Sequence, residues 1–297
     1  MLCTSIQRGC MGMSESDPYV VLSLSGGKDS TAMLLGMLER HEHIDEVINC
    51  DTGMEFPAMY DHLERLFKII HEEGIKLTIL RSEESFEYLM LEKEIKSEKY
   101  GDHYGYGWPS INARWCTKHM KLLLIDNYLK SLKEEHPNMI QCIGLASDET
   151  ERLKRDNNKK KNHRHPLVEW GWDEKKCLQY CYDMGFNWDG LYEIFHRVSC
   201  WCCPLTSIPE LKKLWWYFPL LWHQLEEWEV RMSQENVGKK GRFWFKNETT
   251  VFDLSARFSI EKRRELNGLS NRKLSKEVKN TLIELPKSQK TLDVVIG

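Results

Sequence analysis

Apolar and polar positions alternate in blocks along the first 80 residues of the chain. Segments of strand length that contain β-branched or other apolar residues occupy residues 19–24, 45–50 and 76–80. Between them, residues 31–38 are rich in helix formers, and over residues 57–74 apolar side chains recur every three to four positions. The order strand, helix, strand, helix, strand predicts a parallel sheet with right-handed crossovers.

The same alternation continues further along the chain. Residues 139–143 predict a fourth strand, and Thr117 is placed to cap a helix that runs to Glu135. Periodic apolar positions predict further helices over residues 173–184 and 211–231. The pattern as a whole predicts an α/β fold with a doubly wound parallel sheet, followed by a helical C-terminal region.

Charge is spread unevenly over these elements. The 297 residues carry a formal net charge of −3, yet residues 238–290 contain 14 Lys and Arg against 6 Asp and Glu, so the remainder totals −11. This basic segment suits a phosphate-rich partner through counterion release. So does the polar, lysine-rich run at residues 154–165, for which a solvated surface is the alternative interpretation.

No apolar run approaches the roughly 20 residues that a membrane helix needs. Residues 1–18 lack the charged start and apolar centre of a secretory signal. We therefore expect a cytoplasmic protein without a membrane partner, whose ten cysteines are reduced thiols or ligands of a metal or cluster.

The turn between the first strand and the first helix reads Ser25-Gly26-Gly27-Lys28-Asp29-Ser30. Two glycines allow a tight turn and a close approach of the backbone to a ligand. The helix N-terminus adds N–H groups and a positive dipole end, and the lysine adds a cation. The spacing matches neither the Walker loop nor the dinucleotide-binding pattern, so we predict a shorter loop that binds a pyrophosphate group.

With its flanking strand and helix, this loop resembles that of the PP-loop ATP pyrophosphatases. The resemblance implies an adenine nucleotide α-hydrolase-like fold in which the loop holds the pyrophosphate half of ATP. A substrate oxygen then attacks the α-phosphorus, and a related branch binds adenylyl sulfate compounds instead. On this basis residues 1–18 form an N-terminal extension, 19–204 a nucleotide-binding domain with a cysteine site, and 205–297 a helical, basic C-terminal region.

Polar groups also follow the second and fourth predicted strands, where ligands gather outside the carboxyl ends of parallel strands. Asp51 and Thr52 begin the segment 51–57, which resembles the corresponding segment of phosphoadenosine phosphosulfate reductase relatives. Residues 144–152 resemble a polar motif of the same family. The expected nucleotide-binding residues are Ser25, Gly26, Gly27, Lys28, Asp29, Ser30, Asp51, Thr52, Gly144, Glu149 and Arg152.

Two distant segments carry cysteines that could meet around one centre. Cys200-Trp201-Cys202-Cys203-Pro204 contains a Cys-x-x-Cys pair, and Cys116 stands at a predicted helix N-terminus, where a thiolate is favoured. Four thiolates suit an iron–sulfur cluster or a structural zinc, and structural thiols are the third interpretation. Spacing alone does not choose among them.

Together these segments resemble cluster-bearing members of the same reductase-like superfamily, in which a cysteine quartet holds a [4Fe-4S] cluster. The resemblance implies Cys116, Cys200 and Cys203 as ligands with Cys202 as the fourth, although adjacent cysteines in an extended segment point to opposite sides. The remaining cysteines are expected to be structural: Cys3, Cys10, Cys50, Cys142, Cys177 and Cys181.

The resemblance extends to enzymes that install phosphorothioates in DNA or thiolate tRNA bases. It implies ATP-dependent adenylation with release of pyrophosphate, coupled to sulfur transfer onto a DNA or tRNA substrate from a donor such as a cysteine desulfurase. Gly26 and Gly27 would contact the pyrophosphate, while Lys28 and Mg²⁺ neutralise its charge. The expected catalytic residues are Lys28, Asp29 and Asp51.

Two alternatives remain. A sulfonucleotide reductase would use the same loop, but in that branch a C-terminal cysteine attacks sulfur, and this sequence has no cysteine after Cys203. A nucleotide-binding regulatory subunit without turnover is the other.

Overall fold

The computed structural model describes residues 17–99, 101–154, 162–234 and 244–269. These residues divide into two compact units. The first takes in the described residues up to Cys50, His62–Leu80 and those of Ile125–Phe186. The second takes in Asp51–Asp61, the described residues of Arg81–Leu124 and those from Asn187 onward. The second unit extends across residue 204, where the sequence suggested a domain boundary. It contains the segments of Cys116 and of Cys200–Cys203 together with the C-terminal helices.

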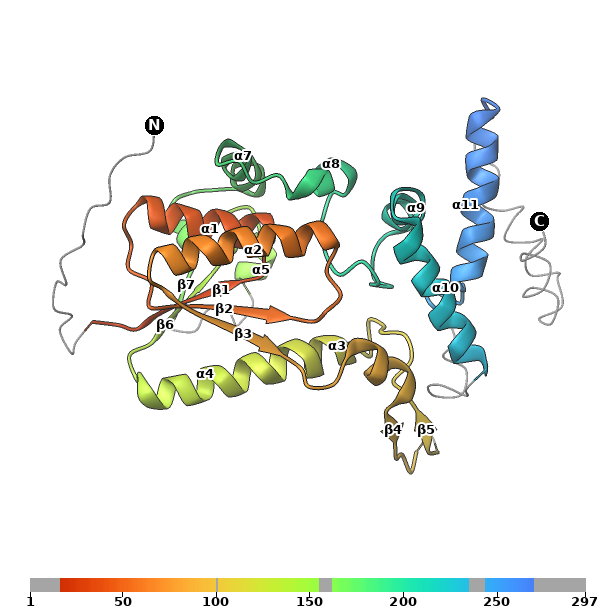
Figure 1. The fold of residues 1–297 in the computed structure, drawn as a ribbon, viewed down its shortest axis with the longest axis horizontal. Coiled ribbons are helices and arrows are strands. Elements are labelled where there is room, and N and C mark those ends of the chain that lie inside the picture. The colour runs from red at the N-terminus through yellow and green to blue at the C-terminus, as the bar shows by residue number, and fades with distance from the viewer. Residues whose placement is uncertain (1–16, 100, 155–161, 235–243, 270–297) are drawn as a thin grey trace. The chain divides into compact units, whose positions relative to one another are not determined.

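A five-stranded sheet with the order β3-β2-β1-β6-β7 forms the framework of the first unit. β1 pairs in parallel with β2 and with β6, and β6 pairs in parallel with β7. Figure 1 shows α1 and α2 over one face of this sheet and α4 over the other. The elements are β1 (Val20–Leu24), α1 (Lys28–Glu39), β2 (Glu46–Asp51), α2 (Pro57–Glu72), β3 (Lys76–Arg81), α4 (Leu123–Glu135), β6 (Ile140–Ile143), α5 (Thr150–Leu153), β7 (His163–Arg164), α6 (Pro166–Glu169) and α7 (Glu174–Asp183).

The apolar pattern explains why these segments pack as they do. Val21 and Leu22 of β1 are fully buried, and so are Met33 and Leu34 of α1, so this strand and helix share the core. Gly74 adopts a positive φ of 70° directly after α2, which ends the helix where the sequence predicted. The doubly wound parallel sheet expected from the sequence is therefore confirmed.

β1 is the strand at which the order of the sheet reverses. The chain moves outward from β1 through β2 to β3, and later returns to place β6 on the other side of β1. In parallel sheets, ligands bind outside the carboxyl ends of strands at such a switch point. The loops that follow β1 and β6 are therefore the positions where the fold favours a binding site.

The second unit is built mostly from short elements and helices. Its described elements are η1 (Tyr88–Glu92), β4 (Glu94–Ile95), β5 (His103–Tyr104), α3 (Trp115–Thr117), η2 (Lys118–Leu122), η4 (Trp188–Gly190), α8 (Leu191–Ile194), α9 (Ile208–Tyr217), α10 (Pro219–Gln234) and α11 (Val251–Leu266). The expectation that Thr117 caps a helix is wrong. Arg114 is the N-cap, and Thr117 ends the turn α3, which continues into the π-helical turn η2 and then α4.

Among the described residues from Ile208 onward, the helices of the second unit are α9, α10 and α11. Trp222 of α10 donates its indole N–H to Ser255 of α11 at 2.8 Å, and Phe258 is fully buried. The helical character expected here is confirmed for the described residues, while much of the basic segment 238–290 lies outside them. No helix among the described residues has the length and apolar character needed to cross a membrane.

A buried carboxylate ties three parts of the first unit together. Glu46 is fully buried and accepts hydrogen bonds from Tyr19 at 3.1 Å and from Thr78 and Tyr128 at 2.5 Å each. Lys76 completes the network with an ion pair at 3.2 Å. Burial alone would raise the pKa of Glu46, but the bonds from Thr78, Tyr128 and Lys76 outweigh it and lower the pKa.

We predict that Glu46→Ala destabilises the fold by about 1–3 kcal/mol, the cost of leaving buried polar groups without a partner. Because the folded pKa lies below the ordinary value of 4.5, the stabilisation is present above that pH and lost as the pH falls through the folded pKa. Urea unfolding at neutral and acid pH measures both effects. The exposed Glu64→Ala on α2 is the control, and equal stability of the two variants at neutral pH would contradict the role of Glu46.

Candidate functional site

The glycine loop lies between β1 and α1, at the switch point of the sheet. Gly26 has a positive φ of 80°, a conformation that favours glycine, and Gly27 is the N-cap of α1. The hydroxyl of Ser30 donates to the carbonyl of Gly27 at 3.0 Å and accepts from the amide of Ser25 at 3.2 Å. The loop is thus closed on itself by short bonds, with the positive end of the α1 dipole facing it.

Lys28 is held by two carboxylates. Its ammonium lies 2.9 Å from Glu174 of α7 and 3.2 Å from Asp29, and its side chain is only 12% exposed. Burial lowers the pKa of Lys28, but the two carboxylates outweigh burial and raise it. The cation predicted for a phosphate is therefore already neutralised in the structure, so an anionic ligand would compete with Glu174.

Asp29 provides a second polar feature of the loop. Burial raises the pKa of Asp29 despite the adjacent Lys28, and the charges of Glu174 and Glu149 add to the effect. Within the described residues, the buried Oδ1 of Asp29 has no hydrogen-bond partner. A carboxylate oxygen is the donor that Mg²⁺ prefers, so Asp29 fits the expected metal as a ligand.

The loop after β6 lies directly against the glycine loop. A Cβ built on Gly144 would lie only 2.9 Å from the Cα and the N of Ser30, so this position has room for glycine alone. Further along, Glu149 interacts electrostatically with Asp29, and it forms an ion pair with Arg152. The structure therefore brings Gly144 and Glu149 to the predicted loop, whereas the charge of Arg152 is taken up by Glu149.

Asp51 and Thr52 belong to the second unit. The carboxylate of Asp51 accepts hydrogen bonds from the amide of Gly53 at 2.7 Å, from Tyr60 at 3.0 Å and from Arg81 at 3.1 Å. Burial would raise the pKa of Asp51, but these donors outweigh it and lower the pKa. Asp51 is thus an ionised carboxylate that organises the turn after β2.

The cysteine segment packs against the same turn. The amide of Cys203 donates to the carbonyl of Cys200 at 3.2 Å, which curls the segment, and the amide of Trp201 donates to Met54 at 3.2 Å. The thiol of Cys200 lies 3.5 Å from a carboxylate oxygen of Glu55. The turn at 52–55 therefore fixes the position of the first cysteine of the Cys-x-x-Cys pair.

All four predicted cysteines interact with one another in the second unit. Cys116 and Cys200 each interact electrostatically with Cys203, and Cys202 interacts with all three others. Burial raises the pKa of Cys116, raises that of Cys200 to about 12 and raises that of the fully buried Cys202 well above its usual value. The structure does not single out Cys202 from the quartet.

The donor set suits the cluster that the sequence suggests. Four thiols from two segments lie close enough to influence one another's ionisation, and soft thiolates select iron–sulfur clusters or zinc. Over the described parts of the chain, no three His, Cys, Asp or Glu side chains converge as ligands of a single ion. Thiols bind a metal as thiolates, so binding of a metal here would release protons.

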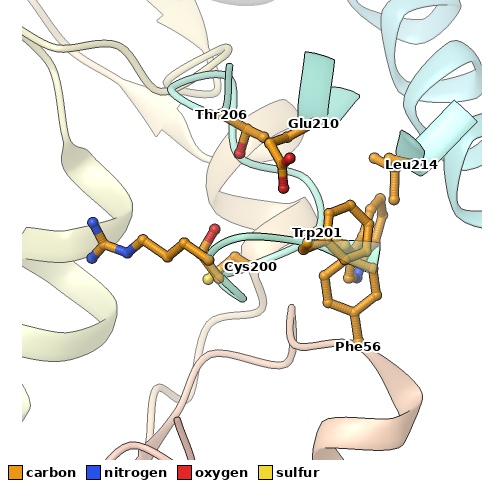
Figure 2. Close-up of a pocket in the computed structure, with 9 residues that line it drawn as sticks. Phe56, Cys200, Trp201, Thr206, Glu210 and Leu214 are labelled. Atoms are coloured by element: carbon orange, nitrogen blue, oxygen red, sulfur yellow. The ribbon is translucent and has the colours of Figure 1, made fainter. Parts of the chain in front are cut away.

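A small pocket opens beside Cys200. Figure 2 shows Thr206 and Glu210 on one side of it and Phe56 on the other, with Cys200 and Trp201 between them. Glu210 is fixed there by the amide of His196 at 3.2 Å and by Lys213 at 2.6 Å. The cysteine site thus borders a cavity with aromatic and acidic walls.

Cations approach the thiols from two directions. Lys121 pairs with Glu55 at 3.7 Å and its charge favours the thiolate forms of Cys116 and Cys200. Lys246 donates to the carbonyl of Pro204 at 2.8 Å and interacts with the charge of Cys203. Neither cation was predicted as a site residue.

Of the residues described above, Glu174, Arg81 and Lys246 were given no role by the sequence reasoning. Each lies far along the chain from its partner, and none carries a local motif. They are identified only by their contacts with predicted site residues. Those contacts form when the chain folds and cannot be read from the sequence.

Two individual proteins show some similarity to the chain. The uncharacterized protein MJ0066 of Methanocaldococcus jannaschii is 26% identical over 237 residues, which cover 76% of this chain and 44% of the relative. The chain therefore spans less than half the length of this relative. The structure of the U34-tRNA thiolase NcsA from Methanococcus maripaludis with its [4Fe-4S] cluster aligns at 15% identity over 74% of this chain and 71% of that one, with a TM-score of 0.36. A likeness of that size bears on neither fold nor chemistry.

A family match includes the sequence and structural features described above. Residues 19–206 match the phosphoadenosine phosphosulfate reductase domain, a span that includes the sheet, the glycine loop and all four clustered cysteines. The match covers well over half of the chain. The protein therefore belongs to the phosphoadenosine phosphosulfate reductase domain family.

Proposed function

We propose that the protein adenylates an oxygen of its substrate with ATP, releases pyrophosphate and transfers sulfur to the activated position. The observation that carries this proposal is the glycine loop at the switch point, where Lys28, Asp29 and the N-terminus of α1 stand together. Backbone amides, a cation and a carboxylate with an oxygen left for a metal are the groups that a departing pyrophosphate needs.

In this reaction the substrate oxygen attacks the α-phosphorus of ATP, and the bond from that phosphorus to the bridging oxygen of the pyrophosphate breaks. Lys28 would exchange its bond to Glu174 for the phosphate oxygens, and Asp29 would hold Mg²⁺, which would neutralise their charge. A sulfur nucleophile then attacks the activated carbon, and AMP leaves with the original oxygen. The cysteine site, when it holds a cluster, supplies a place for sulfur to bind.

We propose nucleic acid as the acceptor. Four basic side chains stand on the described helix α11, namely Arg257, Lys262, Arg263 and Arg264, and the chain on both sides of the helix is basic in sequence. Basic segments bind phosphate backbones through counterion release. Ion pairs such as that of Arg257 with Glu261 reduce the free charge, so the flanking segments would supply much of the affinity.

Membership of the family favours a second candidate, the reduction of adenylyl sulfate or its 3′-phosphorylated form in the same loop. The two reactions leave different products. Pyrophosphate release from ATP in the presence of DNA or tRNA supports adenylation, whereas sulfite release that depends on thioredoxin supports reduction.

Lys28→Ala is expected to lower the rate of pyrophosphate release by about 100-fold or more, because charge on the leaving group loses its cation. A pyrophosphate assay with ATP, Mg²⁺ and nucleic acid measures the rate, and circular dichroism verifies the fold. The control is Lys175→Ala, an exposed lysine of α7. Unchanged turnover in Lys28→Ala would refute the role of the loop.

Gly144→Ala is expected to weaken binding of a non-hydrolysable ATP analogue by about tenfold, since the added methyl group must displace the backbone of Ser30. Titration calorimetry measures the affinity. Gly74→Ala is the matched control, because a Cβ there meets nothing within 4 Å and only its positive φ causes strain. Equal affinity of both variants would show that Gly144 does not shape the site.

Protein purified without oxygen should be brown, absorb broadly near ~400 nm and contain iron and acid-labile sulfide. Cys116→Ala, Cys200→Ala and Cys203→Ala should each lose most of both elements. The half-buried Cys50→Ala should retain them. A colourless wild-type preparation with stoichiometric zinc would overturn the cluster assignment.

A further inference from the structure

Lys246 lies in a tight turn that precedes α11, beyond the residues that match the family. The turn is closed by two backbone bonds, from the amide of Lys246 to Thr249 at 3.0 Å and from the amide of Thr249 to Lys246 at 2.8 Å. Its central residues Asn247 and Glu248 have positive φ values of 45° and 61°. A glutamate rarely adopts this conformation, so the surrounding structure must impose it.

Both ends of the turn are anchored. On one side Phe245 is 2% exposed and packs edge-on against Trp108, with ring centroids 4.9 Å apart. On the other side Thr250 caps α11 through a capping box. These anchors fix the strained turn, and with it the base of the Lys246 side chain.

The first turn of α11 is held as well. The buried carboxylate of Glu229 on α10 accepts the amides of Val251 at 2.8 Å and Phe252 at 3.1 Å. The segment that presents Lys246 is therefore bound to α10 through side-chain and backbone contacts, and its position does not depend on the lysine itself.

The ammonium of Lys246 is directed at the cysteine segment. It donates to the carbonyl of Pro204 at 2.8 Å, directly after Cys203, and its charge interacts with that of Cys203. A surface lysine normally keeps its ammonium in water, whereas this one is partly buried and bound to a backbone carbonyl. An energetically costly turn that delivers a cation to this position indicates a role at the site.

We propose that Lys246 is a positioning residue of the cysteine site, which clamps the Cys203–Pro204 end of the segment and holds a positive charge against the thiolates. The proposal rests on the proposed binding of a cluster by these cysteines. On this proposal, the C-terminal region, which lies outside the matched domain, helps to form the cysteine site.

Two effects separate this role from simple packing. The hydrogen bond to Pro204 orders the segment even without metal. The positive charge offsets the negative charge of a cluster held by four thiolates, which slows loss of iron and raises the reduction potential. Lys246→Arg keeps charge and donor, Lys246→Gln keeps a donor alone, and Lys246→Met removes both.

The test uses the full chain in three measurements. Hydrogen exchange of metal-free protein reports the order of residues 200–206, release of iron to bathophenanthroline disulfonate reports retention, and a redox titration followed by electron paramagnetic resonance reports the potential. In Lys246→Met we expect faster exchange at 200–206, iron loss accelerated about tenfold and a lower potential. Lys246→Gln should lower the potential with smaller effects on exchange, and Lys246→Arg should resemble the wild type.

Two controls isolate the lysine. Lys262→Met removes a lysine of α11 that lies over the ring of Trp216. Glu248→Gly removes the backbone strain of a positive φ at that position and keeps Lys246. Both should match the wild type in all three measurements.

If Lys246→Met and the wild type agree in exchange, iron release and potential, the proposal is wrong. A wild-type protein that binds no iron and sulfide contradicts the proposed function instead. In that case, hydrogen exchange at residues 200–206 of the metal-free proteins still tests whether Lys246 orders the cysteine segment. Should Lys246→Met fail to fold, Lys246→Gln decides in its place, and a potential equal to that of the wild type would overturn the role of the charge.

Discussion

The close contact between Gly144 and Ser30 is the constraint on which the candidate nucleotide site depends. Because no side chain fits between the two backbones, the loop after β6 lies directly against the first turn of α1, beside the strand where the sheet order reverses. Glu149 of this loop lies within electrostatic range of Asp29, and α7 contributes Glu174 to Lys28. The buried network of Glu46 supports the neighbouring part of the sheet, since it links β2 to β3 and α4.

The cysteine site obeys a different constraint, which is the cost of ionising buried sulfur. Burial raises the pKa of Cys116, Cys200 and Cys202, so the thiolates that a metal requires form only with compensating positive charge, from the metal itself or from nearby cations. Lys121 and Lys246 lie far apart in the chain, and both interact with this group of cysteines. The two lysines, the four cysteines and the C-terminal helices belong to a single compact unit.

The sequence predicted the first strand and the glycine loop because both depend on the local pattern of residues. A strand, two glycines and a helix N-terminus follow one another within residues 20–39, and each favours its own conformation without help from distant segments. It failed for Thr117, whose capping propensity lost to a helix that starts at Trp115. Glu174 and Lys246 could not be predicted for another reason. Their partners, Lys28 and Pro204, lie 146 and 42 positions away in the chain, and a local sequence pattern does not reveal such contacts.

The pairing of Lys28 also bears on how the loop would act. A lysine that is free in solution gains its full attraction to a phosphate on binding, whereas Lys28 must first give up Glu174 at 2.9 Å. Under the proposed function, the net contribution of Lys28 to holding intact ATP would therefore be small, and the amides at the N-terminus of α1 would provide most of that affinity. When negative charge gathered on the leaving pyrophosphate, the attraction to Lys28 would grow, with no further loss of bonding to Glu174. We therefore propose that the carboxylate shifts the effect of the lysine from binding the substrate to stabilising the transition state.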